Sequence, residues 1–482
     1  MKKLYLLFTA LLLSLLGIAQ QSSWKIVPGH ITTQWAADVN PANTLPDYPR
    51  PLMQRSDWQN LNGLWQYSII PVSTDENIPV SFEGNILVPF PVESALSGVS
   101  KKVGKDSILW YQRTISVPGK LKGKKVLLHF GAVDWRSDVF VNGQKIGRHE
   151  GGYDPFTFDI TAALKKGSQQ ILSVRVWDPT DDGPQPHGKQ VVHPEGIWYT
   201  SVTGIWQTVW LETVPDTYIA FTKQTPDLDN KNISLSASIE NRQPGDQLSV
   251  SAWKGNEKVA EKTVADTSLI LPVPDPEMWS PSHPFLYKLK VTVMRKGKVV
   301  DEVKSYFAIR KISIAPDAKG IQKMMLNNKF QFEFGPLDQG WWPDGLYTAP
   351  TDDALKFDIV KTKEMGFNMI RKHIKVEPAR WYYYCDSIGM LVWQDMPSGD
   401  LGNHWEPRPG VLGRQTDKDR TAESEGYYRK EWNAIMDALH NYPCIVVWTP
   451  LNEAWGQFKT VEITNWTKQK DPSRLVSSAS GG

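Results

Sequence analysis

The hydrophobic period changes after Ile314, and this change constrains the fold more than any other feature of the sequence. Before it, short apolar and polar alternations typical of strands recur between Gly, Pro, Asn and Asp turns. After it, segments with a helical apolar period alternate with short apolar strands. The chain therefore joins an all-β region to a region of alternating strands and helices. With 482 residues, it is long enough for about three domains.

The composition excludes a disordered chain and argues against a nucleic-acid partner. Hydrophobic residues make up 40% of the chain and charged residues 22%, which is typical of a folded protein. Lys and Arg total 54 against 52 for Asp and Glu, so no overall positive field would attract a polyanion. The 21 tryptophans are in excess, and they suit both deep cores and surfaces that stack on sugar rings.

Residues 51–214 predict a first β-sandwich. Strands are expected at 125–130, 137–141 and 171–176, where β-branched and aromatic residues lie between turn residues. The pair Asn142-Gly143 tolerates positive φ and predicts a tight hairpin after the second of these strands. Short strands with frequent turns are typical of a sandwich.

Residues 216–314 predict a second β-sandwich, which Pro215 and Asp216 link to the first. Apolar and polar residues alternate over 234–239 and again over 288–293. A length of about 100 residues suits an immunoglobulin-like domain.

Residues 315–482 predict part of a (β/α) barrel. Thr351 can cap the first helix of this region, and Gly366 and Gly389 suit the ends of the first two helices. Strands that alternate with helices predict a parallel sheet, and the lack of a glycine-rich phosphate loop in the sequence favours a barrel over a dinucleotide-binding fold. The strands are expected at 330–334, 368–374, 390–394, 444–448 and 475–478.

This last region is too short for a whole barrel. An eight-unit barrel takes about 250 residues, and residues 315–482 are enough for about five units. An open parallel half-sheet would leave an unpaired edge. We therefore expect a truncated reading frame or a fragment, with the barrel incomplete at its C-terminal end.

Residues 1–19 predict a cleaved export signal. Two lysines precede an apolar run over 4–18, and the small residues Gly17 and Ala19 lie where a signal peptidase would cut. The alternative, a membrane anchor, needs roughly 20 apolar residues, more than this run has. We expect a protein that is exported to the periplasm or secreted, with no membrane partner after cleavage.

The cysteine and histidine positions favour neither a disulfide nor a metal site. Cys385 lies in an aromatic helical run and Cys444 begins an apolar strand, so both are interpreted as buried small apolar residues. No His lies with Cys or acidic residues at zinc spacing, so no catalytic metal is expected. No cofactor is expected either.

The strongest candidate for chemistry is Glu453, at the carboxyl end of the fourth predicted strand, where barrel enzymes carry their catalytic groups. Trp448 and Trp455 flank it, and a carboxyl partly removed from water can stay protonated and donate its proton to a glycosidic oxygen. Asn452 beside it is suited to hold a sugar hydroxyl. The alternative is that Asn452 and Glu453 cap the next helix.

Other polar side chains are expected at the same rim of the barrel, which is formed by the carboxyl ends of its strands. Arg371, His373 and Lys375 alternate on one face at the end of the second predicted strand, and Asp395 follows the third. The alternatives are a structural salt bridge for Arg371, a helix cap or salt bridge for Asp395 and a plain hydrogen bond for His373. Candidates for stacking on a sugar, or for the core, are Trp341, Trp342, Trp393 and Trp405.

Short motifs occur in a defined order along nearly all of the chain after the export signal. Those of the first sandwich lie at 130–135, 141–143, 150–152, 158–161 and 204–207, those of the second at 279–281, 284–287 and 307–311, and those of the last region at 367–371, 385–386 and 452–453. Each is weak alone, but the ordered set resembles glycoside hydrolase family 2. The resemblance implies a jelly-roll sugar-binding domain, an immunoglobulin-like domain and a TIM-barrel catalytic domain, in that order.

By this resemblance Glu453 corresponds to the family's general acid/base. Asn452 precedes it, and Arg371 stands at the strand-two position that the family keeps for its active site. The family includes β-galactosidases, β-mannosidases and β-glucuronidases, which retain the anomeric configuration and mostly act on terminal sugars. The remaining expected substrate contacts are His373, Asp395, Trp393 and Trp455.

The chain departs from the family pattern in three places. Ile374 stands where many members have a His three residues after the strand-two Arg, and His373 comes one residue earlier. The segment 393–397 lacks the adjacent pair of acids found in galactosidase-like members. The family's nucleophile is a Glu near the end of strand seven, whereas this chain ends near strand five.

A retaining mechanism needs two carboxyl groups about 5 to 5.5 Å apart, and only Glu453 is identified. The alternative is an inverting arrangement with a gap of about 6.5 to 9.5 Å, in which another acid replaces the missing base. The candidates for that base are Asp395, Glu333, Asp338 and Asp344.

We therefore predict a glycosidase that hydrolyses terminal β-linked sugars by a retaining two-carboxylate mechanism, with the nucleophile missing from this chain. The alternative is a non-catalytic carbohydrate-binding protein or an inactive fragment. The expected partner is a carbohydrate in both cases, and the sequence carries no prediction of the oligomeric state.

Overall fold

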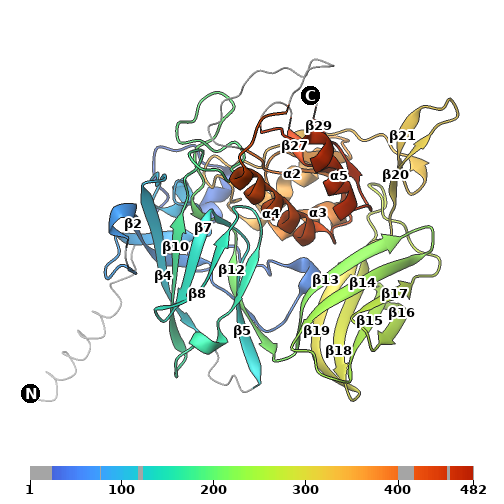
Figure 1. Ribbon diagram of the computed structural model, residues 1–482, viewed down its shortest axis with the longest axis horizontal. Coiled ribbons are helices and arrows are strands. Elements are labelled where there is room, and N and C mark those ends of the chain that lie inside the picture. Colours follow the sequence, from blue (N-terminus) through green and yellow to red (C-terminus); the bar gives the residue numbers. More distant parts are fainter. Residues whose placement is uncertain (1–23, 76, 118–122, 400–416, 453–455, 481–482) are drawn as a thin grey trace, which may run out of the picture.

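The computed structural model describes residues 24–75, 77–117, 123–399, 417–452 and 456–480. Figure 1 shows two β-sandwiches, blue to cyan and green to yellow, with the helices of the last region, orange to red, above the junction between them. The predicted export signal lies outside the described residues. None of the described helices combines the length and the apolar composition that crossing a bilayer requires.

The first sandwich consists of two antiparallel sheets, ordered β3-β2-β4-β10-β7-β8 and β1-β12-β5-β9. The strands predicted at 125–130, 137–141 and 171–176 are confirmed as β5, β7 and β10. Asn142 and Gly143 turn the predicted hairpin into β8 with φ of 53° and 82°. Apolar side chains from both sheets form one core between them.

The elements of this part of the chain are β1 (Trp58–Asn60), β2 (Gly63–Pro71), β3 (Gly84–Val88), β4 (Ser107–Ser116), β5 (Lys124–Phe130), β6 (Val133–Asp134), β7 (Arg136–Val141), β8 (Gln144–Glu150), β9 (Phe156–Asp159), β10 (Gln169–Trp177), β11 (Gly204–Ile205) and β12 (Val209–Pro215). Short 3-10 helices are η1 (Gln34–Asp38), η2 (Pro51–Met53), η3 (Val72–Thr74), η4 (Ala95–Ser97) and η5 (Thr161–Ala163).

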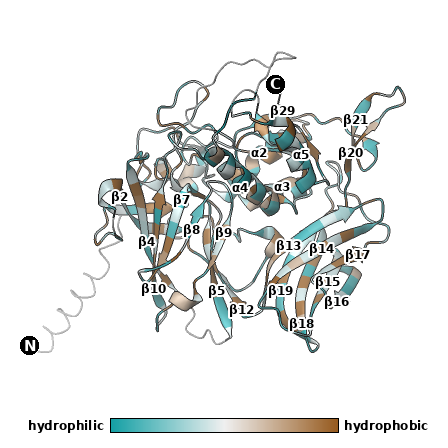
Figure 2. Ribbon diagram, in the orientation of Figure 1, coloured by the Kyte–Doolittle hydropathy of each residue, from teal (hydrophilic) through white to brown (hydrophobic). Residues whose placement is uncertain are grey.

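The second sandwich packs sheet β13-β14-β17 against sheet β16-β15-β18-β19. The alternation predicted at 234–239 is confirmed in β14, where Leu235 and Ala237 are buried and Ser234, Ser236 and Ser238 are exposed. Figure 2 shows this alternation of teal and brown along the strands. The strand bounds are β13 (Tyr218–Asp227), β14 (Asn232–Glu240), β15 (Asp246–Lys254), β16 (Glu257–Val264), β17 (Ser268–Pro272), β18 (Tyr287–Arg295) and β19 (Lys298–Phe307).

The barrel strand predicted at 330–334 is wrong, because the first strand of the parallel sheet is β23 (Leu337–Asp338). The side chain of Asn368 donates to Phe332 O at 2.7 Å and accepts from Phe334 N at 2.9 Å. These backbone groups thus bond to one side chain, while the phenylalanine rings stay exposed. A projecting three-stranded sheet ends at the start of this segment and consists of β20 (Ile312–Pro316), β21 (Gln322–Leu326) and β22 (Lys329–Phe330).

The last region forms a parallel sheet ordered β23-β24-β25-β26-β28. The strands predicted at 368–374, 390–394, 444–448 and 475–478 are confirmed by the last four of these. Among the described residues β23 and β28 are the edges, so this part of the sheet does not close, as expected of an incomplete barrel. The bounds are β24 (Met369–Lys372), β25 (Leu391–Asp395), β26 (Ile445–Thr449), β27 (Leu451–Asn452), β28 (Leu475–Val476), β29 (Ala479–Ser480), α2 (Asp352–Glu364), α3 (Ala379–Ile388), α4 (Ala422–Leu439) and α5 (Thr460–Lys470).

Local signals explain where these helices begin and end. The Thr351 hydroxyl accepts from the backbone N–H of Ala354 and caps α2, as predicted. Gly389 ends α3 in the left-handed conformation, with φ of 85°, which glycine adopts without strain. Cys385 and Cys444 are buried, as predicted, and form no disulfide.

Polar contacts orient the second sandwich on the barrel segment. Asp386 of α3 accepts from the Tyr306 hydroxyl and from Cys444 N, both at 2.7 Å, and its backbone oxygen accepts from Trp279 Nε1 at 2.8 Å. Arg310, 3% exposed, donates to backbone oxygens at the start of β26. Since unpaired buried polar groups are costly, these contacts select one packing of the two domains.

Buried carboxyl groups lie in the first sandwich and where it meets the barrel segment. Glu431 of α4 accepts from two backbone N–H groups of the sandwich, at 2.7 and 3.0 Å. Burial raises the pKa of Glu93 to about 8 and that of Asp178 to about 6, and it also raises the pKa values of Asp134 and Glu431. Burial therefore shifts each of these groups towards its neutral acid form, relative to the same group in water.

Glu93→Gln should weaken the pH dependence of stability. The folded-state pKa of Glu93, about 8, lies above its unfolded value of about 4.3, so its contribution to stability is present below about pH 4 and is lost as the pH rises towards 8. We expect the wild-type melting temperature to fall between about pH 5 and 8, and that of Glu93→Gln to fall less. Scanning fluorimetry against pH measures both slopes, with the exposed Glu257→Gln as the control. Equal slopes for Glu93→Gln and wild type would contradict the assignment.

Candidate active site

Polar side chains gather at the carboxyl ends of β24, β25 and β26. Because these strands are parallel, their carboxyl ends lie at the same edge of the sheet. Arg371 lies in β24, Asp395 is the last residue of β25, and Asn452 follows β26 in the short strand β27.

Asp395 and Arg371 form the centre of this cluster. Arg371 Nε donates to Asp395 Oδ1 at 3.0 Å, and Nη2 donates to Oδ2 at 2.7 Å. The same Nη2 donates to Asn452 Oδ1 at 3.1 Å, and His373 Nδ1 lies 2.8 Å from Asp395 Oδ2. The Asp395 side chain is 2% exposed and that of Arg371 is 18% exposed, so Arg371 is the more accessible member of the pair. The structure thus brings four of the predicted site residues together.

Lys375 does not join this cluster, and the alternation predicted for Arg371, His373 and Lys375 is wrong at its last member. Strand β24 ends at Lys372, and Ile374 has φ of 47°, so the backbone turns before Lys375. The Lys375 ammonium instead donates to the backbone oxygens of Gly340 and Tyr347, at 2.6 and 2.8 Å.

A buried chain of charges supports the rim. Lys372 Nζ lies 2.6 Å from Asp338 and 2.8 Å from Glu377, and Lys375 Nζ lies 3.0 Å from Glu377. Burial alone would raise the pKa of Asp338, but the Lys372 ammonium outweighs it and lowers that pKa below its usual value. Asp338 is therefore held as a carboxylate that ties β23 to β24.

Glu333 occupies a different environment from the other acids considered as a substitute base. Trp393 Nε1 donates to Glu333 Oε2 at 2.5 Å, and burial raises the pKa of Glu333 to about 7. Trp393 lies two residues before Asp395, on the same face of β25. Asp344 accepts from Thr33 N and Thr33 Oγ1, both at 2.7 Å, and this use of the carboxylate is structural.

A loop of the first sandwich reaches the rim. The N–H groups of His187 and Gly188 donate to Ser398 O, after β25, at 2.9 and 3.2 Å. Lys189 Nζ donates to Gln339 Oε1 at 3.3 Å, just after β23. Sequence reasoning missed Lys189 and Gln339, because they come from domains about 150 residues apart and form no motif.

Aromatic rings at the rim differ in accessibility. Half-buried Trp341 and Tyr199 lie with ring centroids 4.5 Å apart and planes 32° apart, so this pair remains a candidate for sugar stacking. Trp342 is 7% exposed and packs edge-on against Trp35, as a core residue does. The predicted residues Glu453, Trp455 and Trp405 lie outside the described residues.

Arg420 joins the loops on both sides of the rim. Its Nη2 donates to Gly399 O, after β25, and to Gly456 O, after β27, both at 2.9 Å. Its guanidinium also stacks over Phe458, with 4.2 Å to the ring centroid. Sequence reasoning missed Arg420, because a charge just before a helix is typical of a solvated surface.

Within the described ranges, no three His, Cys, Asp or Glu side chains are placed so that they could hold a metal ion. The rim instead offers guanidinium, imidazole and amide groups beside aromatic rings. This set suits hydrogen bonding to hydroxyl groups of a neutral or anionic ligand.

Similar proteins carry names of glycosidases. A beta-galactosidase from Thermoanaerobacter pseudethanolicus is 27% identical over 358 residues, which are 71% of this chain and 44% of that protein. A beta-glucuronidase from Formosa agariphila is 24% identical over 397 residues, 76% of this chain and 38% of that protein. The solved Ruminococcus gnavus beta-glucuronidase has the same fold, with a TM-score of 0.73 and 19% identity over 90% of this chain and 74% of that chain. The chain spans about a third to just under half of the length of the curated relatives it matches.

Family models match all three regions of the chain. The sugar-binding domain of glycosyl hydrolases family 2 matches residues 79–215, the family 2 model between the outer domains matches 217–310, and the family's TIM barrel domain matches 325–481. Three models of one family, in this order, agree with the two sandwiches and the parallel sheet. The chain belongs to glycoside hydrolase family 2.

Proposed function

We propose that the protein is a glycosidase that hydrolyses terminal β-linked sugars by a retaining two-carboxylate mechanism, with Glu453 as the general acid/base. One observation carries the proposal: Arg371 binds Asp395 and also donates to Asn452, the residue directly before Glu453. This contact ties the end of β24 to the chain segment that leads into Glu453. Membership of the family and the names of the relatives support the same chemistry.

The described rim residues have distinct proposed roles. Asp395 accepts from both Arg371 and His373, so it serves to orient these two side chains, and it is a poor candidate for a nucleophile or a base. We propose that Arg371 and Asn452, which bond to each other, also contact sugar hydroxyls. The Trp341–Tyr199 pair is proposed to stack on a sugar ring.

The retaining reaction also needs a nucleophilic carboxylate. The family resemblance assigns no residue of 315–482 to that role. Glu333, whose pKa of about 7 reflects burial beside Trp393, is partly protonated at neutral pH and is a weak nucleophile there. Asp338 is bound to Lys372. We therefore propose that the nucleophile is not among the described residues.

We also propose that the protein is exported. The lysines and the apolar run of residues 1–19 support a cleaved signal. Intact-mass measurement of protein recovered from the periplasm or medium tests this, since cleavage after Ala19 removes a defined mass. Recovery of only the uncleaved chain from the cytoplasm would contradict it.

Glu453→Gln should remove most turnover on substrates with poor leaving groups. An amide cannot donate the proton that an alkoxide leaving group needs, and the loss of general acid catalysis costs about 100-fold to 10,000-fold in rate. The assay uses the protein in the longer form that supplies the nucleophile, and it compares alkyl β-glycosides with 4-nitrophenyl β-glycosides of galactose, glucuronic acid and mannose. The smaller loss is expected for the nitrophenyl substrates, because nitrophenolate leaves without protonation.

The matched control for Glu453→Gln is Glu462→Gln, an exposed change on α5 that should leave all rates unchanged. Equal turnover of alkyl glycosides by Glu453→Gln and wild type would remove the assignment of Glu453. Sugar binding without product release by the wild type, with binding retained in Glu453→Gln, would favour a non-catalytic carbohydrate-binding protein.

Asp395→Asn should weaken sugar binding with little effect away from the rim. The amide keeps one acceptor oxygen but loses the charge that holds Arg371 and His373, and a charge-assisted hydrogen bond contributes about 1.5 to 3 kcal/mol. We expect the affinity for a glycoside or its inhibitor to fall about 10-fold to 100-fold, as measured by calorimetry. The exposed Asp353→Asn is the control. Unchanged affinity in Asp395→Asn would place the sugar elsewhere.

A further inference from the structure

Arg420, which directly precedes the cap of α4, joins two loops of the rim. Its Nη2 donates to Gly399 O, after β25, and to Gly456 O, after β27, both at 2.9 Å. The segment before α4 contacts the second loop again, because Lys418 N donates to Gln457 O at 2.7 Å. Three separate stretches of the barrel segment are thus held together at this point.

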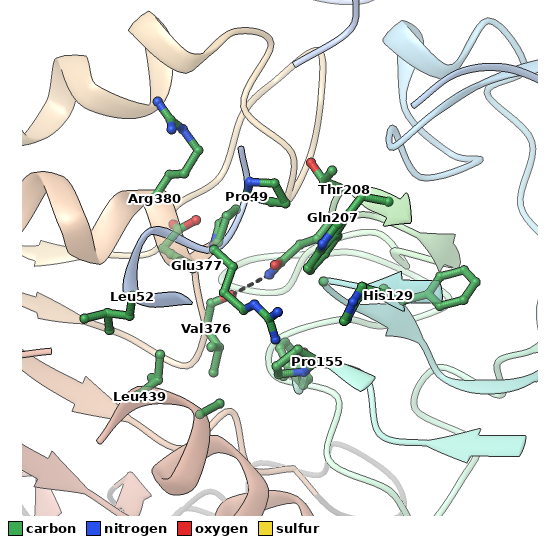
Figure 3. Close-up of a pocket in the computed structure, with 18 of the residues that line it drawn as sticks. Pro49, Leu52, His129, Pro155, Gln207, Thr208, Val376, Glu377, Arg380 and Leu439 are labelled. Carbon is green, nitrogen blue, oxygen red and sulfur yellow. Dashed lines mark hydrogen bonds between the residues drawn. The ribbon is translucent and has the colours of Figure 1, made fainter. Parts of the chain in front are cut away.

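Helix α4 gives Arg420 a fixed base. The Thr421 hydroxyl caps the helix by accepting from Ser424 N at 3.1 Å, and the Glu431 carboxyl in its middle accepts from two backbone N–H groups of the first sandwich. At the other end of the helix, Leu439 lies in the wall of the cavity that Figure 3 shows between the domains. Other parts of the fold therefore hold the helix, and with it the backbone of Arg420.

Two aromatic rings hold the guanidinium of Arg420. It lies over the rings of Phe458 and Tyr428, at 4.2 and 5.1 Å from their centroids, and both of these side chains are buried. A guanidinium is planar and always protonated, so packing against rings fixes the direction of its N–H donors.

The two loops approach each other closely where Arg420 binds them. Gly456 has φ of 67°, and a Cβ at this residue would lie 3.0 Å from Ser398 Oγ and 3.1 Å from Arg420 Nη2. Gly399 has φ of 106°. Glycine adopts such angles without strain and leaves room for the close approach. A shift of either loop would break a charge-assisted hydrogen bond from Arg420.

Two arginines make the same kind of link between these loops. Arg371 links the last residue of β25 to Asn452, and Arg420 links Gly399 to Gly456. Asn452 is the residue directly before the proposed general acid/base, and Gly456 comes three residues after it. The chain is thus bound to the end of β25 or to the loop after it on both sides of that residue.

We propose that Arg420 is a positioning residue for Glu453. By binding Gly456 to Gly399, it holds the chain after Glu453 at a fixed distance from the end of β25, the strand that carries Asp395. A general acid protonates the glycosidic oxygen only within hydrogen-bond reach, and a displacement of about 1 Å can lower the rate about 100-fold. The inference rests on the proposed role of Glu453 and adds a residue that sets its place.

The test is Arg420→Met, which keeps an unbranched side chain against Phe458 and removes the N–H donors. In the longer form of the protein that supplies the nucleophile, kcat/KM is measured for a methyl β-glycoside and for the 4-nitrophenyl β-glycoside of the same sugar. Only the methyl glycoside depends on protonation of its leaving group, so we expect its value to fall about 10-fold to 100-fold and the nitrophenyl value to fall less than about threefold.

A merely structural role would lower the amount of folded enzyme, and with it both values by the same factor. A ratio of the two values equal to that of the wild type would therefore overturn the inference. Should Arg420→Met fail to fold by circular dichroism, Arg420→Lys is measured in the same way. It keeps a cation near Phe458 but is shorter, and it should lower the ratio several-fold.

Arg429→Met is the matched control. Arg429 lies on the same helix, binds Glu425 and Glu462 and packs over Trp466, so its loss removes ion pairs without a contact to the loops that Arg420 joins. The ratio should stay as in the wild type.

The result is separable from that for the proposed function. If Glu453→Gln loses turnover of alkyl glycosides while Arg420→Met keeps the wild-type ratio, only the role of Arg420 is overturned. If Glu453→Gln keeps that turnover, the assignment of Glu453 and the inference that rests on it are both overturned.

Discussion

The parallel sheet of the barrel segment depends on burial that the two sandwiches supply. Trp206 of the first sandwich and Trp279 of the second belong to the same apolar cluster as Trp381 of α3 and Trp448 of β26. A parallel sheet is stable when both of its faces are covered, and large rings remove much apolar surface from water. The domains are therefore parts of one packed unit.

Polar contacts decide how these apolar surfaces meet. Apolar packing alone tolerates several orientations, whereas a buried hydrogen bond is lost when its partners shift. Glu431 accepts hydrogen bonds from two backbone N–H groups of the first sandwich, and Asp386 accepts one from the Tyr306 hydroxyl of the second. The same orientation carries the loop with Lys189 to the end of β23, where it contacts Gln339.

Much of the candidate site could be predicted, because it lies at strand ends. Arg371, Asp395 and Asn452 follow apolar runs in the sequence, and parallel strands bring their ends to one edge. The predicted position of Lys375, on the same face as Arg371 and His373, is wrong. The positive φ of Ile374 ends the alternation of the strand, and nothing in the sequence pattern indicates this turn. Arg420 could not be predicted, because its role depends on carbonyl oxygens of Gly399 and Gly456 in two different loops.

The sequence by itself determined the order of domains, most strands and helices and their caps, because these follow from side-chain period and local chemistry over a few residues. The one strand predicted wrongly, at 330–334, has the alternation of a strand, but the side chain of Asn368 bonds to two of its backbone groups, Phe332 O and Phe334 N. Only the tertiary structure decided which polar groups pair and where a cavity remains. Arg50 meets Glu212 because packing brings together residues far apart in the chain, and no local pattern encodes that contact.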